Sequence, residues 1–224
     1  MTSCGSDATP PLTGVPAPRA LLTDLRVLAA NRQSVGPWRA GREPAVVVGD
    51  VGWDATGRWD PADLAVLDVA DVVTPNDAEA MRYTRTGSAR RAARALADRV
   101  ALAVVTCGGR GVVACDGAQE IVLPAAPAQA VDVTGAGDTF AAALTWALIH
   151  GLPLRAALSL ASIAASLTVE HPGGSTGAPT PARIAARARR TELGPGYDLS
   201  FLDLLDDEEI ASTTTPPPHE GTPR

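Results

Sequence analysis

The stretch from Val131 to Phe140 constrains this chain most, because a glycine-rich turn there runs directly into an apolar segment that is predicted to be helical. We expect the backbone N–H groups of Gly135, Ala136 and Gly137 to lie free and close together at the positive end of the helix dipole. Such a site binds an anion without any basic side chain. Asp138 lies within it, and a carboxylate beside a phosphoryl group in transfer can act as a general base.

The charged residues exclude several classes of protein. All nineteen basic residues are arginines. Without lysine the chain can have neither a Walker A loop nor the strand lysine of a protein kinase. The net charge of −6 argues against a nucleic-acid partner. One basic cluster is interpreted as a solvated helix face rather than a polyanion site: Arg183, Arg187, Arg189 and Arg190.

Neither a membrane nor an oxidising compartment is indicated. The chain has no charged-then-apolar secretory start, and its longest apolar run, residues 156–169, is too short to span a bilayer. Cys4, Cys107 and Cys115 form neither a disulfide framework nor a metal-binding pattern. We therefore expect a cytoplasmic protein without a membrane partner.

The length of 224 residues fits one domain with irregular ends. Residues 1–19 are rich in Pro, Ser, Thr and Gly and are predicted to be disordered. Residues 20–190 are predicted to form the nucleotide-binding and catalytic domain. Residues 191–224 are predicted to be an acidic, Pro- and Thr-rich tail that is largely disordered.

Strand and helix patterns alternate along the central part, which predicts an α/β fold with a mainly parallel sheet. Residues 36–43 are predicted to be a loop. The predicted strands are 45–49, 71–74, 101–106, 111–115 and 120–123, and the predicted helices are 20–32, 61–69, 77–83, 88–100, 138–150 and 154–169.

Two further motifs have structural as well as chemical interpretations. Residues 106–111, Thr-Cys-Gly-Gly-Arg-Gly, would let the backbone approach a ligand closely, but a plain hairpin explains them equally well. Residues 75–79, Pro-Asn-Asp-Ala-Glu, would place polar groups at the end of a strand, and an Asn cap with an acidic first turn also accounts for them.

Taken in order, the three motifs resemble those of the PfkB (ribokinase-like) family of carbohydrate kinases. Residues 132–138 match its D-T-x-G-A-G-D signature with Val133 in place of Thr, residues 76–79 match N-x-x-E, and residues 106–111 match T-x-G-x-x-G. The resemblance covers about residues 45–180, including the loop 172–175. Residues 50–59 match D-x-N-x-R-x-x-W in part, with Gly52 at the usual Asn.

The resemblance implies a three-layer α/β/α fold. It also implies that the family's N-terminal strands and the lid over the sugar are missing, because residues 1–44 do not resemble them. The half of the site that binds the nucleotide is then expected to be present, and most of the half that selects the acceptor is expected to be absent.

The resemblance also implies an ATP-dependent carbohydrate or nucleoside kinase. Asp138 would be the general base, and Gly135, Ala136 and Gly137 would form the anion hole. Glu79 would hold Mg²⁺ through water. The remaining nucleotide-binding positions would be Asn76, Thr106, Gly108, Gly111 and Gly137.

The resemblance further implies a loop that binds a monovalent cation, K⁺. Its members would be Asp132, Thr134, Thr168, His171 and Gly173. Asp132 could instead only brace the turn, and His171 could be an ordinary surface residue. The alternative function is a truncated, non-catalytic nucleotide-binding remnant that acts as a partner or regulatory module. Association into a homo-oligomer is also compatible with the sequence.

Overall fold

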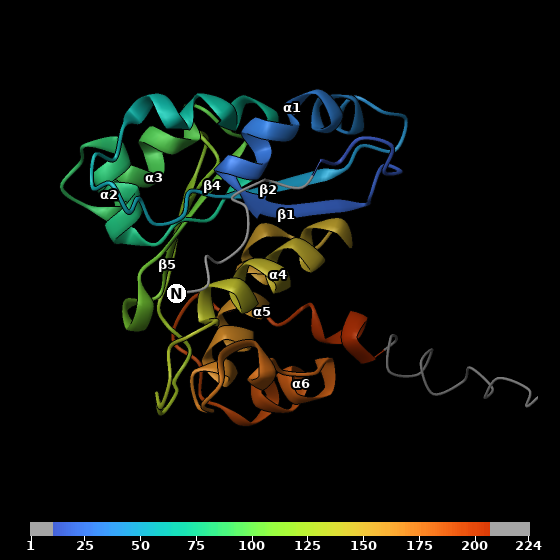
Figure 1. Ribbon diagram of the computed structural model, residues 1–224. Coiled ribbons are helices and arrows are strands. Elements are labelled where there is room, and N and C mark those ends of the chain that lie inside the picture. The colour runs from blue at the N-terminus through green and yellow to red at the C-terminus, as the bar shows by residue number, and fades with distance from the viewer. Residues whose placement is uncertain (1–10, 207–224) are drawn as a thin grey trace, which may run out of the picture.

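The computed structural model describes residues 11–206, which contain one six-stranded sheet in the order β1-β2-β3-β4-β5-β6. Strands β1 to β4 run parallel, whereas β5 and β6 are antiparallel to their neighbours. Figure 1 shows the order of the elements in space. The strands are β1 (Ala20–Asp24), β2 (Val46–Asp50), β3 (Val72–Val73), β4 (Leu102–Thr106), β5 (Val112–Cys115) and β6 (Glu120–Leu123).

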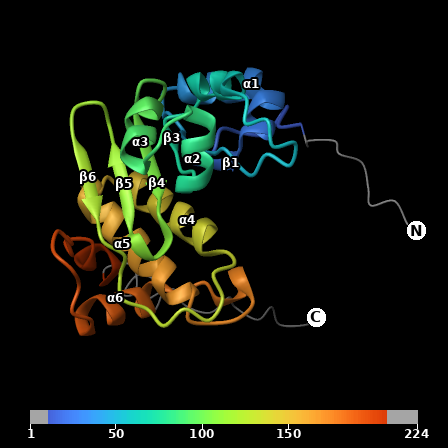
Figure 2. The same cartoon turned by 90° about the vertical axis from the view of Figure 1, so that its left-hand side faces the viewer.

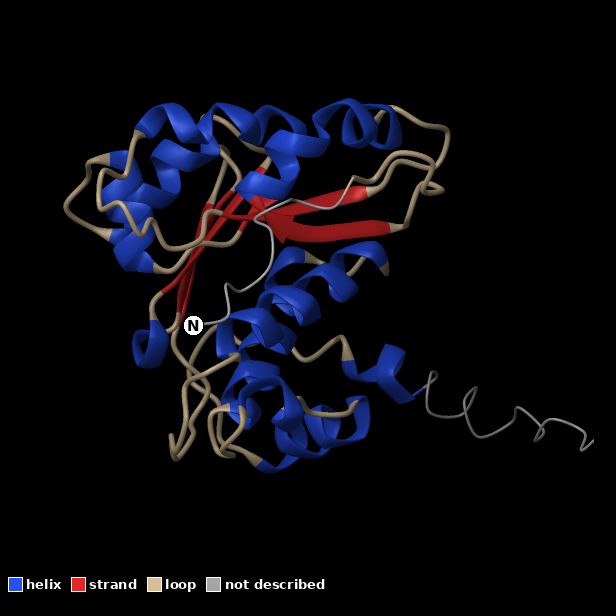
Figure 3. Ribbon diagram, in the orientation of Figure 1, coloured by secondary structure: helices blue, strands red, loops and turns tan. Residues whose placement is uncertain are grey.

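Helices cover both faces of the sheet, so the predicted three-layer architecture is confirmed (Figure 3). One face carries α1 (Leu25–Arg39), the 3₁₀ helix η1 (Pro61–Val69), α2 (Asp77–Thr84) and α3 (Ala89–Ala97). The other face carries α4 (Ala136–Ile149) and α5 (Leu154–Thr168), with α6 (Pro181–Arg190) packed on α5. Two shorter 3₁₀ turns are η2 (Gly108–Arg110) and η3 (Gly174–Gly177).

The side chains of β2 point alternately to the two faces of the sheet and so contribute to the core on each face. Val46 and Val48 point into the core beneath α4 and α5, whereas Val47 points into the core beneath α1. A strand that is buried on both faces is a continuous β-branched run, which is why this segment was predictable. None of the helices within residues 11–206 is long and apolar enough to cross a membrane.

The predicted helix over residues 20–32 is wrong in its first turn, and the loop predicted over residues 36–43 is wrong over residues 36–39, which belong to α1. Residues 20–24 form the edge strand β1, and α1 continues to Arg39 across a kink at Asn31 and with Pro37 inside it. The Asp24 carboxylate accepts a hydrogen bond from Val27 N–H at 2.9 Å and so starts the helix at Leu25. The boundary was missed because apolar residues on both sides of Thr23 and Asp24 also fit a helical pattern.

The antiparallel side of the sheet depends on one glycine. Gly111 joins η2 to β5 with φ +95, and a Cβ atom there would lie 2.0 Å from the carbonyl oxygen of Leu123 in β6. The three strands β4, β5 and β6 lie side by side in Figure 2. A side chain at Gly111 would therefore push the β6 end away from the hairpin.

The packed core extends beyond residue 190. Phe201 is fully buried and Leu205 is 3 % exposed, and both belong to the cluster formed with α5 and α6. At the other end, Leu12 N–H donates to the Asn31 side-chain oxygen at 2.7 Å. The predicted boundaries at residues 19 and 190 thus fall inside packed structure, whereas residues 1–10 and 207–224 lie outside the described part.

We predict that Gly111→Ala destabilises the fold far more than Gly117→Ala. Gly117 also has positive φ (+84), but a Cβ atom there would meet nothing within 4 Å. Gly117→Ala should cost the backbone strain alone, about 1 kcal/mol, whereas Gly111→Ala adds a clash with backbone atoms. Urea unfolding followed by circular dichroism measures both. Equal losses of unfolding free energy would contradict the role assigned to Gly111.

Phe201→Ala should cost about 3–5 kcal/mol of unfolding free energy, as expected for a large side chain removed from a core. Leu202→Ala, one position along and only half-buried, is the matched control and should cost clearly less. If both variants unfold at the wild-type midpoint, residues 191–206 do not belong to the packed unit in solution.

Candidate active site

A cavity of about 320 Å³ lies at the carboxyl ends of the parallel strands. Three of the sequence motifs reach it, each from a different element. The lining residues are Leu22, Thr23, Asp24, Asp50, Thr74, Asn76, Glu79, Thr106, Gly137, Asp138 and Ala141. Ligands commonly bind at this edge of an open α/β sheet, because the loops and helix N-termini converge there.

The predicted anion turn begins α4. Gly135 is the N-cap with φ 74, and its carbonyl accepts from Thr139 N–H at 2.9 Å. All three N–H groups of the turn were expected to be free. The Ala136 N–H is not, because it donates to the Val133 carbonyl at 3.3 Å. Within residues 11–206, the N–H groups of Gly135 and Gly137 have no acceptor, and Asp138 is exposed beside them. The turn therefore offers two unsatisfied donors next to a carboxylate.

The N-x-x-E element forms a capping box at the start of α2. The Asn76 side-chain oxygen accepts from Glu79 N–H at 3.0 Å, and Glu79 Oε2 accepts from Asn76 N–H at 3.1 Å. The helix-cap interpretation is therefore confirmed. Glu79 is 8 % exposed, and burial raises the pKa of its carboxyl group above the ordinary value. Both side chains still line the cavity, so capping positions them there.

The T-x-G-x-x-G segment is a hairpin turn that is joined to this cap. Thr106 N–H donates to the Pro75 carbonyl at 3.0 Å, and Thr106 pairs with Asn76 in an isolated parallel bridge. The Arg110 guanidinium forms an ion pair with Asp77 in the first turn of α2. Thr106 reaches the cavity, whereas Gly108 and Gly111 lie in the turn beside it and do not line it.

Asp132 braces the loop before α4, as the structural interpretation of this residue proposed. Its carboxylate accepts from Thr134 N–H at 2.9 Å and from Gly173 N–H at 3.2 Å. These bonds lower the pKa of Asp132, that from Thr134 most. They bring three of the five predicted cation-loop positions together behind the anion turn, outside the cavity.

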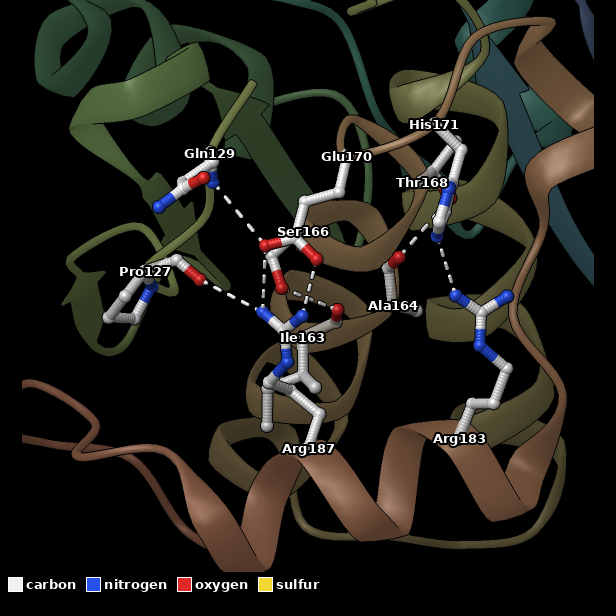
Figure 4. Close-up of polar contacts among 10 residues, drawn as sticks. All are labelled: Pro127, Gln129, Ile163, Ala164, Ser166, Thr168, Glu170, His171, Arg183 and Arg187. Carbon is white, nitrogen blue, oxygen red and sulfur yellow. Dashed lines mark hydrogen bonds and ion pairs between the residues drawn. The ribbon is translucent and has the colours of Figure 1, made fainter. Parts of the chain in front are cut away.

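The other two predicted cation-loop positions lie at the end of α5 (Figure 4). The buried Thr168 hydroxyl lies within hydrogen-bond distance of the Ala164 carbonyl, 3.2 Å, and of Thr139 Oγ1, 3.1 Å, which ties α5 to the first turn of α4. The Thr168 carbonyl accepts from His171 N–H at 3.2 Å. The His171 ring contacts the Arg183 guanidinium, with 2.8 Å between Nε2 and Nη2.

Two of the arginines of α6 are paired with carboxylates. Arg187 is paired with Glu170 and also donates to the Pro127 carbonyl at 3.2 Å (Figure 4). This pairing lowers the pKa of Glu170. Arg189 is paired with Asp206 at 2.6 Å. The prediction that this basic cluster is not a polyanion site thus has a structural explanation.

Sequence reasoning did not assign four polar residues that line the cavity, of which Thr23 lies in β1. Asp24 and Asp50 end the adjacent strands β1 and β2, where they are register partners, and Thr74 follows β3. Burial raises the pKa of Asp50, and the Asp138 and Asp24 carboxylates raise it further. For Asp50 and Thr74 the available signal was their position at the end of a buried strand, and for Asp50 the partial D-x-N-x-R-x-x-W match was a second one, whereas Asp24 ends a strand that the sequence did not predict.

The oxygen atoms available as metal ligands in the cavity fit Mg²⁺ that is held mainly through water and phosphate oxygens. The Thr74 hydroxyl oxygen is buried without any hydrogen-bond partner, and the Glu79 carboxylate and the Asn76 amide line the same cavity. Among the described residues, no three His, Cys, Asp or Glu side chains are grouped closely enough to hold a metal by themselves. Mg²⁺ characteristically takes few protein ligands and keeps several waters.

Asp138 also borders a second, largely apolar cavity of about 340 Å³ on the far side of α4. This cavity lies between α4, α5 and the start of α6, and Trp146 and Ile184 contribute to its wall. The exposed carboxylate thus separates a polar cavity from an apolar one.

Comparison with known proteins gives one family. The sequence profile of the pfkB family carbohydrate kinases matches residues 49–181. The ribokinase of Bacillus subtilis is 39 % identical over 120 residues, which are 54 % of this chain and 40 % of that protein. The bifunctional protein HldE of Caulobacter vibrioides is 35 % identical over 177 residues, which are 75 % of this chain and 34 % of that protein. The chain thus spans less than half the length of these curated relatives.

Solved structures give the same fold. Arabidopsis thaliana ribokinase, solved with ribose and ATP, has a TM-score of 0.62 and 26 % identity, and the match covers 77 % of this chain and 56 % of that one. An Escherichia coli protein assigned as ribokinase II, solved with ATP and Mg²⁺, has a TM-score of 0.66 at 20 % identity, covering 77 % and 59 %. This coverage exceeds the span 45–180 recognised from the motifs.

We predict that Asp50→Asn increases stability more at neutral pH than in acid. A carboxyl group whose pKa is raised in the folded state contributes stability below its unfolded pKa, 3.8, and loses it as the pH rises through the folded value. The free-energy difference between Asp50→Asn and wild type should therefore grow in favour of the variant from about pH 3.5 to 7. Urea unfolding at several pH values measures it, and a difference independent of pH would show that Asp50 is not perturbed.

Proposed function

Because the chain belongs to the PfkB family of carbohydrate kinases, we propose that it transfers the γ-phosphoryl group of ATP to a hydroxyl group of a sugar or nucleoside. The observation that carries the proposal is the start of α4, where the N–H groups of Gly135 and Gly137 lack acceptors and Asp138 stands beside them. Phosphoryl transfer depends mainly on positioning and on charge stabilisation, and this arrangement can supply both.

In the proposed reaction the Asp138 carboxylate accepts the proton of the acceptor hydroxyl. The hydroxyl oxygen forms a bond to the γ-phosphorus while the bond to the bridging β–γ oxygen breaks, and ADP leaves with that electron pair. The N–H groups of Gly135 and Gly137 donate to the oxygens on which charge develops. Preorganised donors of this type are typically worth about 10²–10³ in rate each.

The second wall of the cavity is proposed to serve the metal and the nucleotide. Glu79, held by its capping bond to Asn76, would orient the waters of Mg²⁺, and bound Mg²⁺ would neutralise charge on the phosphates. Thr106 would contact the phosphates from the cavity wall. Gly108 and Gly111 would contribute through the shape of their turn, because neither lines the cavity.

K⁺ binding behind the anion turn is the less supported part of the proposal. Asp132, Thr134 and Gly173 are connected by hydrogen bonds, and a K⁺ ion would have to share the Asp132 carboxylate with two N–H donors. The Thr168 carbonyl already accepts a hydrogen bond from His171 N–H, so it could bind K⁺ only through its second lone pair. His171 is the weakest member, because its ring is in contact with Arg183.

Asp138→Asn should lower ATP-dependent phosphorylation by about 10²–10⁴-fold and leave nucleotide binding nearly unchanged, because only the proton acceptor is removed. The assay is ADP release over a panel of sugars and nucleosides, with calorimetry for binding of MgATP. Asp116→Asn is the matched control, because Asp116 lies in the exposed turn between β5 and β6, where Asn can also accept the turn's hydrogen bonds.

Transfer that survives Asp138→Asn would remove the proposed base from the mechanism. A wild-type chain that binds MgATP and phosphorylates no acceptor would instead support the alternative, a non-catalytic nucleotide-binding module.

A further inference from the structure

Two carboxylates on the wall of the cavity have no part in the proposed chemistry. Asp24 and Asp50 are register partners at the ends of the parallel strands β1 and β2, so their Cα atoms are about one strand spacing, ~5 Å, apart. Like charges side by side on adjacent strands are unfavourable unless something offsets the repulsion. No arginine or histidine is among the residues that line this cavity.

Both carboxylates retain unused acceptor capacity. Asp24 is known to accept one bond, from Val27 N–H, and Asp50 accepts a long one of 3.4 Å from Gly52 N–H. An ionised carboxylate has about four acceptor sites and no donor. The buried Thr74 hydroxyl, which has no partner, lies on the same wall and adds an independent polar group without a protein contact.

The two carboxylates line the same cavity as the reactive groups but reach it from other elements. Leu22, Thr23 and Asp24 come from edge strand β1, whereas Asn76, Thr106 and Gly137 come from the elements assigned to phosphate and metal. Asp138 is near enough to Asp50 to raise its pKa. A hydroxyl group that approaches Asp138 from the β1 side would therefore bring the rest of its molecule against Asp24 and Asp50.

We propose that Asp24 and Asp50 bind the acceptor through its hydroxyl groups and restrict it to an uncharged polyhydroxy compound, excluding phosphorylated sugars and sugar acids. The inference rests on the proposed function, whose acceptor class it narrows. Hydroxyl donors form strong, charge-assisted bonds to carboxylates. A second anionic group on the acceptor would face the carboxylates of Asp24, Asp50 and Asp138, and built-in repulsion of this kind is a common source of specificity.

The test uses the full chain and acceptors that differ only by a phosphate: ribose with ribose 5-phosphate, and fructose with fructose 6-phosphate. Calorimetry in the presence of a non-hydrolysable ATP analogue and Mg²⁺ gives the affinities, and ADP release gives kcat/KM. In each pair, the affinity and kcat/KM of the wild type should be at least about tenfold higher for the free sugar than for the sugar phosphate. Like-charge repulsion across a binding site readily supplies a ratio of this size.

Asp24→Asn is the decisive variant. Asparagine is as good an N-cap as aspartate, so α1 should still start at Leu25, while one negative charge leaves the cavity wall. The preference for the free sugar should fall by about tenfold, mainly because the sugar phosphate binds better. Asp50→Asn should act in the same direction, and Asp116→Asn, in the β5–β6 turn, should leave the ratio unchanged.

The outcomes separate the inference from the proposed function. Selective binding of free sugars without any transfer would support the acceptor class and contradict catalysis. Transfer to sugar phosphates with equal or greater kcat/KM would overturn the acceptor class and leave the kinase proposal standing. The absence of measurable sugar binding, or an Asp24→Asn variant with the wild-type ratio, would also overturn the acceptor class.

Discussion

The parallel pairing of β1 to β4 is the constraint on which the candidate site depends. It places the carboxyl ends of four strands at one edge, so that Asp24, Asp50, Thr74 and Thr106 meet although they lie far apart in the sequence. The helix starts at α2 and α4 face the same edge, where their N–H groups and dipoles favour negative charge. A register shift by one residue in any of these pairs would turn a lining side chain to the other face of the sheet.

Much of the site was predictable because its local chemistry is encoded in short segments. The turn before α4 needs Gly135 at positive φ, and the cap of α2 needs an Asn with a Glu three residues later. Such signals are contained within a few residues. The edge strand β1 was missed because its short apolar segment also fits the helical pattern that follows Asp24, and only pairing with β2 defines it as a strand. The Asp24–Asp50 pair could not be predicted either, since register is a tertiary property.

Several site residues also have a structural role that would by itself explain why that residue type stands at that position. The Asn76–Glu79 pair is a complete capping box, Asp132 is a brace between two loops, and Gly111 avoids a clash with β6. For the capping box the structural role does not compete with ligand binding, because Asn76 and Glu79 also line the cavity. Groups that touch phosphates or metal must be held within a fraction of an ångström, and the same hydrogen bonds that fold the segment hold them. A structural explanation for a motif residue is therefore weak evidence against function.

The acidic residues at this edge of the sheet link the stability of the fold to ligand binding. Burial and neighbouring carboxylates raise the pKa of Asp50, and burial with Asp50 nearby raises that of Glu79, so the folded chain keeps these groups in an unfavourable environment at neutral pH. The buried Thr74 hydroxyl adds an unsatisfied polar atom at the same place. Backbone strain and unsatisfied groups persist where the surrounding fold over-determines them, and they cluster at functional sites. A ligand that supplies hydroxyl donors or positive charge here stabilises the folded state by its binding free energy. Under the proposal above, the same carboxylates that weaken the fold would also determine which ligands stabilise it.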